Sequence, residues 1–190
     1  MAARVYTAQE AAAVSGAPMA LIQKAVSRRK IPSAQGVSRR RLLDRTAVLA
    51  FALAAALPEE LHVSPELAYR LLHDSSAPGD GVPDEVVLGN TVRIDTGAAL
   101  TAARRRLALY ERARESIVSD PELMGGTPVL RGTRITARSI LGRIEGGDSV
   151  ETILEDYPYL DPEGIEAAAL YAKANPPRGR PAGRLCRRAS

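Results

Sequence analysis

The stretch DPELMGGTPVLRGTRI, residues 120–135, decides the fold of the C-terminal third of the chain. Two glycines, a proline and a further glycine surround two short apolar pieces, residues 128–130 and 133–135. This pattern predicts a small hairpin that turns at Arg131-Gly132. Arg131 and Arg134 would then project from one compact loop.

Three helices are predicted after this hairpin, each from its own start and stop signals. The predicted caps are Thr136, Asp148 in a capping-box pattern with Glu151, and Asp161; the predicted stops are Gly146-Gly147, Pro158 and Asn175. Helical spacing places these residues on the buried faces: Ala137, Ile140, Leu141, Ile144, Val150, Ile153, Leu154, Tyr157, Ile165, Ala168 and Ala172. Two short helices joined by a tight turn make a helix-turn-helix.

Residues 116–175 resemble the antitoxin-type domain catalogued as domain of unknown function 433. The shared features are the phrase GGTPVLRGTRIT, the short helix ending in GG, and the helices DSVETILEDYP and DPEGIEAAALYA. The resemblance implies a helix-turn-helix antitoxin whose partner is a small PIN-like ribonuclease toxin.

The composition of the chain favours small helical units. It has 190 residues, 45% hydrophobic and only 4% aromatic, without tryptophan, so its cores must consist of Ala, Leu, Ile and Val. Its single cysteine, Cys186, excludes an internal disulfide, and no secretory leader is recognisable, so we expect a cytoplasmic protein. The longest apolar run, residues 47–57, is well short of the roughly twenty residues that a membrane span needs.

Charge is distributed unevenly along the chain. The net charge is +7 over residues 1–57, −3 over 58–115, −5 over 116–175 and +5 over 176–190. Because both ends are basic, we expect them to bind polyanions, and we expect the acidic middle to bind protein.

The N-terminal region predicts a winged helix-turn-helix. A capping box at Thr7 and Glu10 starts a short helix that ends at Gly16, and Pro18 opens a second helix. A basic, strand-like piece over residues 37–41 and an apolar helix starting near Asp44 complete the order helix, helix, hairpin, helix.

Residues 6–51 resemble the MerR and excisionase type of DNA-binding head. The resemblance implies that the second helix enters the major groove and that the hairpin follows the DNA backbone. Gln23 is the one plausible base reader; the other candidates would contact phosphates. The DNA-binding candidates are Gln23, Lys24, Ser27, Arg28, Arg29, Lys30, Arg39, Arg40 and Arg41. The alternative is an ordinary solvated charged face.

Residues 58–115 predict connecting elements. A helix begins at Ser64-Pro65, a loop covers residues 75–83, a hairpin turns at Gly89-Asn90, and Asp95 caps a long helix. We expect the triplet Arg104-Arg105-Arg106 to form salt bridges on the surface of that long helix. The hairpin and helix of this region weakly resemble the N-terminal hairpin and the helix after it, so a second wing-like unit is an open alternative.

The C-terminal helix-turn-helix is poorly suited to DNA, because Glu163 and Glu166 on its last helix would repel phosphates. We therefore expect this segment to form a homodimer or to contact the toxin, unless it is only a compact fold. The candidate contact residues are Val129, Arg131, Arg134 and Ile135.

The tail, residues 176–190, is too rich in Pro, Gly and Arg to form a core, and we expect it to be disordered alone. We hypothesise that one or more of its arginines enters the acidic metal site of a PIN-like nuclease, since a guanidinium clamps a carboxylate at two points. These candidates are Arg178, Arg180, Arg184, Arg187 and Arg188. The alternative is a loose polycation that adds to DNA affinity.

Catalysis is not expected, because no nucleophile-elbow, P-loop or metal-ligand pattern is present. His62 and His73 have no ligand-like spacing to Cys186, and no cofactor is implied. Three functions remain: an antitoxin that neutralises a PIN-like ribonuclease and represses its operon, a DNA-binding regulator or excisionase-like factor without a toxin, and a nuclease.

The expected architecture is mainly α with short β-hairpins. It comprises a winged helix-turn-helix head (1–57), connecting helices and a hairpin (58–115), a hairpin and three-helix helix-turn-helix domain (116–175), and the basic tail (176–190).

Overall fold

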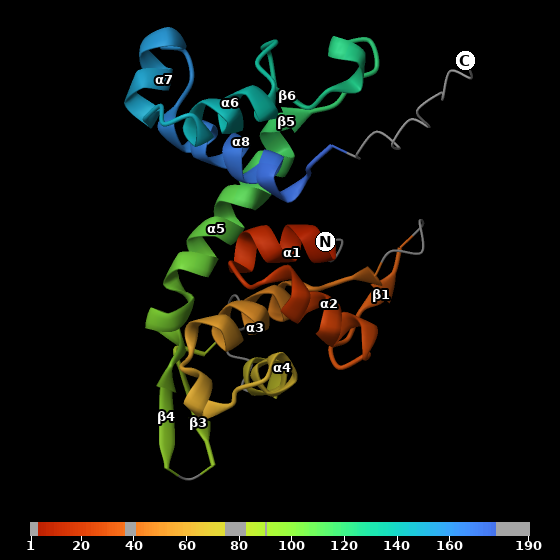
Figure 1. The fold of residues 1–190 in the computed structure, drawn as a ribbon, viewed down its shortest axis with the longest axis vertical. Helices are drawn as coiled ribbons and strands as arrows, with labels where there is room; N and C mark the ends of the chain where they lie inside the picture. Colours follow the sequence, from red (N-terminus) through yellow and green to blue (C-terminus); the bar gives the residue numbers. More distant parts are fainter. Residues whose placement is uncertain (1–3, 37–40, 75–82, 90, 178–190) are drawn as a thin grey trace, which may run out of the picture.

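The computed structural model describes residues 4–36, 41–74, 83–89 and 91–177. The fold is mainly helical, with short antiparallel strand pairs, as the sequence predicts. A long helix, α5 (Thr96–Ser116), runs between an N-terminal group of helices and a C-terminal group (Figure 1). None of the described helices is both long enough and apolar enough to cross a membrane.

The N-terminal group has the predicted order of elements: α1 (Ala8–Ser15), α2 (Met19–Ser27), β1 (Ala34–Gln35), β2 (Arg41–Leu42) and α3 (Arg45–Ala56). The predicted capping box is confirmed, since Thr7 and Glu10 each bond the other's backbone N–H. Gly16 ends α1 at a φ of 76°, and the Asp44 carboxylate caps α3. The predicted strand over 37–41 is described only at Arg41, because residues 37–40 lie outside the described part.

The middle of the chain packs on the same core as the N-terminal helices. Its elements are η1 (Glu59–Leu61), α4 (Pro65–Asp74), β3 (Glu85–Leu88), β4 (Val92–Asp95) and α5. The predicted hairpin is confirmed by the pairing of β3 with β4, and the Asp95 carboxylate caps α5. One hydrophobic cluster extends from Tyr6 to Tyr110 and includes Ala174 from the other end of the chain.

The C-terminal group contains β5 (Ile117–Val118), η2 (Met124–Gly126), β6 (Val129–Leu130), α6 (Ala137–Glu145), α7 (Val150–Asp156) and α8 (Pro162–Ala174). The predicted turn at Arg131-Gly132 is present, with Gly132 at a φ of 76° and Thr133 N–H bonded to the Leu130 carbonyl at 3.0 Å. The strand pairing differs from the prediction, because β6 pairs with β5. The second predicted arm forms no named strand: the Leu130 N–H bonds the Ile135 carbonyl at 2.9 Å, and Val129 forms an isolated bridge with Thr136, the residue after the arm.

The predicted cap of α7 is one residue off. Ser149 is the cap: its hydroxyl accepts a bond from the Thr152 N–H at 3.2 Å. Asp148 instead accepts a 2.6 Å bond from Nε of Arg143, a charged partner that the local pattern did not include. The Thr136 and Asp161 caps are confirmed.

Helix α8 lies at the centre of the C-terminal group, packed against α5 and α6, and its end reaches α1 (Figure 1). Its buried residues include Ile165, Ala168 and Ala172, as predicted, together with Ala167 and Ala174. Small side chains at these positions let the helices approach closely. This packing makes α8 a structural helix with little free surface.

Candidate nucleic-acid interface

Helix α2 presents a basic face to solvent because its apolar residues face the core. Ile22 and Ala25 are buried, and Met19, Leu21 and Val26 are partly buried. The predicted DNA-binding residues of this segment are all exposed: Gln23, Lys24, Ser27, Arg28, Arg29 and Lys30. The amphipathic spacing of α2 therefore places its apolar side chains towards the core and the candidate DNA-binding side chains on the surface, as the sequence predicts.

The chain leaves α2 through a tight turn centred on Arg29. The N–H of Arg29 bonds the Val26 carbonyl at 3.2 Å, and the N–H of Lys30 bonds the Ala25 carbonyl at 3.0 Å. These two bonds form a Schellman motif, in which glycine usually occupies the left-handed position. Arg29 occupies it here with a φ of 53°, at a cost of about 1 kcal/mol for a non-glycine residue. The strained position keeps a cation at the end of the basic helix.

Three of the candidate residues have partners within the chain. Arg41 on β2 is partly buried and donates from Nη1 to the Val26 carbonyl at 2.9 Å, which fixes the wing to the end of α2. The Ser27 hydroxyl donates to the Lys24 carbonyl at 3.1 Å, and Lys30 pairs with Glu66 at 3.2 Å. Arg41 is thus a positioning residue of the wing.

The remaining described candidates are free. Among the residues that the structure describes, Gln23, Lys24, Arg28 and Arg29 have no side-chain partner. A concavity of about 380 Å³ lies beside Arg29, which lines it together with Arg41, Ser33 and Gln35. Arg39 and Arg40 lie outside the described residues. Cations without carboxylate partners are the groups that phosphates neutralise.

The four candidate residues for dimer or toxin contact differ in how exposed their side chains are. Val129 is 0% exposed and Ile135 is partly buried, so both belong to the packing of the C-terminal group. Arg131 is exposed and its Nη2 donates to the Glu115 carbonyl at 2.7 Å. Arg134 is exposed and has no side-chain partner among the described residues. Of the four, the two arginines present accessible side chains.

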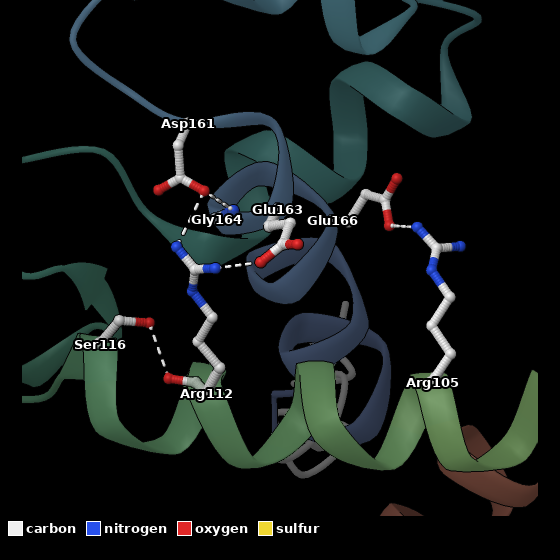
Figure 2. Close-up of polar contacts among 7 residues, drawn as sticks. All are labelled: Arg105, Arg112, Ser116, Asp161, Glu163, Gly164 and Glu166. Atoms are coloured by element: carbon white, nitrogen blue, oxygen red, sulfur yellow. Dashed lines mark hydrogen bonds and ion pairs between the residues drawn. The ribbon is translucent and has the colours of Figure 1, made fainter.

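The carboxylates of α8 are neutralised by arginines of α5. Figure 2 shows Arg112 between Asp161, at 3.0 Å, and Glu163, and Arg105 against Glu166. Asp161 also caps α8 by accepting from the Gly164 N–H at 2.7 Å. The expectation that the arginine triplet forms surface ion pairs is confirmed at Arg105 and at Arg104, whose Nη1 pairs with Asp84 at 3.3 Å.

The third arginine of the triplet has a different role. Arg106 is partly buried and donates from Nε to the Val14 carbonyl at 2.7 Å and from Nη2 to the Ser15 carbonyl at 3.1 Å. A cation at the C-terminus of α1 also complements the helix dipole. Arg106 therefore joins α5 to the helix that precedes α2.

A group of tyrosines that the sequence did not predict joins the two ends of the chain. The rings of Tyr110 and Tyr171 stack with centroids 6.1 Å apart, and Tyr6 lies 6.3 Å from Tyr110. Burial, reinforced by a hydrogen bond to Glu10, raises the pKa of Tyr110 far above its usual value. Burial and a hydrogen bond to Glu111 do the same for the pKa of Tyr6. No local pattern predicts this cluster, because its members are distant in sequence.

The predicted toxin-binding arginines, Arg178, Arg180, Arg184, Arg187 and Arg188, lie outside the described residues. The last described residues, Pro176 and Pro177, line a groove of about 670 Å³ with Tyr171 of α8 and Arg138 of α6. The tail thus starts at the junction of α6 and α8.

Comparison with known proteins bears out the resemblance over residues 117–172, which match the family described as Protein of unknown function (DUF433). Uncharacterized protein y4eO of Sinorhizobium fredii (strain NBRC 101917 / NGR234) is 45% identical over 87 residues, 46% of this chain. The match spans 39% of that relative's length. The X-ray crystal structure of Rv2018 from Mycobacterium tuberculosis is 17% identical, covering 86% of this chain and 95% of that chain with a TM-score of 0.33.

Proposed function

We propose, from the match of residues 117–172 to the DUF433 family model, that the protein is a type II antitoxin. It neutralises a PIN-like ribonuclease toxin and represses its own operon by binding double-stranded operator DNA. It acts in the cytoplasm as a homodimer and needs no cofactor.

The observation that carries the DNA-binding part is the set of unpaired cations at the end of α2. Lys24, Arg28 and Arg29 are exposed and without partners among the described residues, beside a wing anchored by Arg41. Folded proteins usually pair some surface cations, as α5 does with α8 here. A row of unpaired cations next to an exposed helix supports contact with phosphates.

The accessible outer face of α2 supports a specific contact as well. Gln23 is exposed on this face, and a glutamine amide can bond two edges of an adenine in the major groove. Ala20 is exposed on the same face and can contact a thymine methyl group. A single such helix reads few bases, which favours two copies on one operator.

The packing of α8 supports assigning the C-terminal group to protein contact. A recognition helix needs a free face, whereas α8 packs on four other helices and its acids pair with α5. Arg131 and Arg134 remain as accessible candidates for a partner's carboxylates.

A second candidate function is a DNA-binding regulator or excisionase-like factor without a toxin. It is favoured by the location of the unpaired cations of α2, Lys24, Arg28 and Arg29, which lie on the N-terminal helices and could bind DNA without a toxin partner. A PIN-like gene adjacent to this one distinguishes the antitoxin from this alternative.

The DNA-binding part is tested by titrating the pure protein into a fluorescent duplex from its own promoter region across a salt series. Each phosphate contact adds about 0.9 to the slope of log affinity against log salt. We expect Lys24→Ala and Arg28→Ala each to lower the slope by about 0.9.

Lys173→Ala is the matched control, because Lys173 is exposed on α8, away from the basic helix. It should leave both affinity and slope unchanged. A salt-independent affinity, or equal losses in Lys24→Ala and Lys173→Ala, would contradict DNA binding by α2.

A further inference from the structure

A groove of about 650 Å³ runs along the flank of α2 that faces α3 and the segment leading to α4. Its lining includes Leu21, Leu57 and Val63, which provide an apolar floor. Lys24 and Arg28 stand on its rim, and both lack partners among the described residues. Such a groove suits an apolar side chain surrounded by carboxylates.

One element of the rim is strained. His62 is exposed and has a φ of 47°, a left-handed conformation that is uncommon for residues other than glycine. Backbone strain of this kind is concentrated at binding sites. The strained backbone at His62 therefore indicates that the segment between α3 and α4 contributes to the shape of the groove.

The opposite end of the molecule carries a complementary feature. Tyr159, between α7 and α8, is 66% exposed, the largest value among the exposed large hydrophobic side chains described. Residues 144–172 around it contain eight acids and no Lys or Arg. Glu151 and Glu155 of α7 are exposed and have no ion-pair partner among the described residues.

The groove and Tyr159 cannot meet within one chain. The groove lies among the N-terminal helices, whereas α7 lies at the far end of the molecule beyond α5 (Figure 1). The net charges of the two regions, +7 over residues 1–57 and −5 over 116–175, attract each other between molecules.

We propose that the α2–α3 groove binds the Tyr159 side chain and the acidic face of α7 from a second copy of this chain. The tyrosine ring fills the apolar floor, and Glu151 and Glu155 face Lys24 and Arg28. Aromatic side chains that insert into such pockets carry most of the binding energy of an interface.

This contact does not depend on the proposed function. The groove shares Lys24 and Arg28 with the proposed DNA surface, so a second copy and DNA would compete for these two cations, whereas Gln23 and Ser27 lie on the outer face and do not line the groove. A protein that fails to bind DNA can still self-associate, and the two results are measured separately.

The test is sedimentation velocity of the full chain without DNA, over a range of protein and salt concentrations. Tyr159→Ala and Arg28→Glu should each weaken self-association about tenfold or more. Higher salt should weaken the wild-type contact, because exposed charges are screened. Arg138→Glu, an exposed arginine on α6, should have no effect.

Two further measurements separate the contact from a folding defect. Glu155→Arg added to Arg28→Glu should restore association, because the charges are exchanged. An equimolar mixture of Tyr159→Ala and Arg28→Glu retains one intact groove and one intact tyrosine, so it should associate more strongly than either variant alone. A monomer at all concentrations, or self-association unchanged by both single variants, overturns the proposal.

Discussion

The Tyr110 hydroxyl on α5 donates a 2.5 Å hydrogen bond to Oε1 of Glu10 on α1. The other oxygen of the same carboxylate accepts from the Thr7 N–H and so completes the capping box of α1. Nδ2 of Asn175, at the end of α8, donates to the Tyr110 hydroxyl at 3.0 Å. A single chain of hydrogen bonds therefore ties the N-terminal helices to the C-terminal end of α8.

Tyr110→Phe should destabilise the fold by about 2 kcal/mol, because it leaves a partly buried carboxylate and the Asn175 amide without their shared partner. Urea unfolding at neutral pH measures the change. Tyr159→Phe is the control: its ring is exposed, and its free energy of unfolding should be unchanged. Equal values for both variants would contradict the importance of the hydrogen bonds.

Stability should fall as the pH rises above about 10. Burial, with a hydrogen bond to Asp44, raises the pKa of Tyr69 to about 12, and the pKa of Tyr6 and of Tyr110 is raised as well. In the unfolded chain a tyrosine loses its proton near pH 10, so the stabilisation is complete below that pH and is lost as the pH rises towards the folded pKa.

Tyr69→Phe tests this linkage. Each shifted tyrosine contributes a slope of about 1.4 kcal/mol per pH unit above pH 10, so the variant should lose stability less steeply than the wild type. Urea unfolding between about pH 8 and about pH 11 gives both slopes. Identical slopes would contradict the assignment to Tyr69.

The sequence predicts the features that depend on near neighbours. The predicted caps at Thr7, Asp95, Thr136 and Asp161 are correct because each bond spans three residues. The pairing of β6 with β5 was missed because a continuous hairpin pattern at residues 128–135 competes with a strand that follows α5 directly.

Ion pairs between helices that are distant in sequence could not be predicted, because they do not involve near neighbours. Glu163 and Glu166 form a recognisable acidic face, but their partners Arg112 and Arg105 are found only when α8 packs on α5. The exposed cations of α2 were predicted because amphipathic spacing is local. Which of these cations lack an ion-pair partner was not predicted, since the pairing of Lys30 with Glu66 depends on how α4 packs.

Two glycine substitutions should change stability in opposite directions. Gly16 has a φ of +76°, and an added Cβ would lie 3.1 Å from Nη2 of Arg106, so Gly16→Ala should cost about 2 kcal/mol. Gly142 lies within α6, where an added Cβ meets nothing within 4 Å, so Gly142→Ala should stabilise by about 1 kcal/mol. Thermal unfolding measures the stability of both variants. Changes of the same sign would contradict the left-handed conformation at Gly16 or the helical, unobstructed position of Gly142.

Arg29→Gly should stabilise the protein while weakening its binding to DNA. Glycine relieves the left-handed strain at this position, for a gain of about 1 kcal/mol, and removes a cation beside the wing. Arg29→Ala is the control, because it removes the same charge but keeps the strain. Urea unfolding and duplex titration should show weakened binding in both variants and higher stability in Arg29→Gly alone.

Removal of the tail tests the expected mode of toxin neutralisation. A chain ending at Pro176 lacks Arg178, Arg180, Arg184, Arg187 and Arg188, and it should retain duplex binding by α2 while failing to inhibit the proposed PIN-like ribonuclease toxin. The measurement is RNA cleavage by the purified toxin with increasing amounts of each chain. Full inhibition by the shortened chain would contradict a role for the tail.

Replacing all five tail arginines by lysine separates a clamp from a general polycation. Lysine keeps the charge but cannot bond a carboxylate at two points in one plane. If arginines occupy the metal-binding carboxylates of the toxin, the lysine chain should inhibit poorly, and added divalent metal should reactivate the toxin at lower concentration than with the wild type. If the lysine chain inhibits as well as the wild type, charge alone is sufficient, and the tail is a polycation without a specific site on the nuclease.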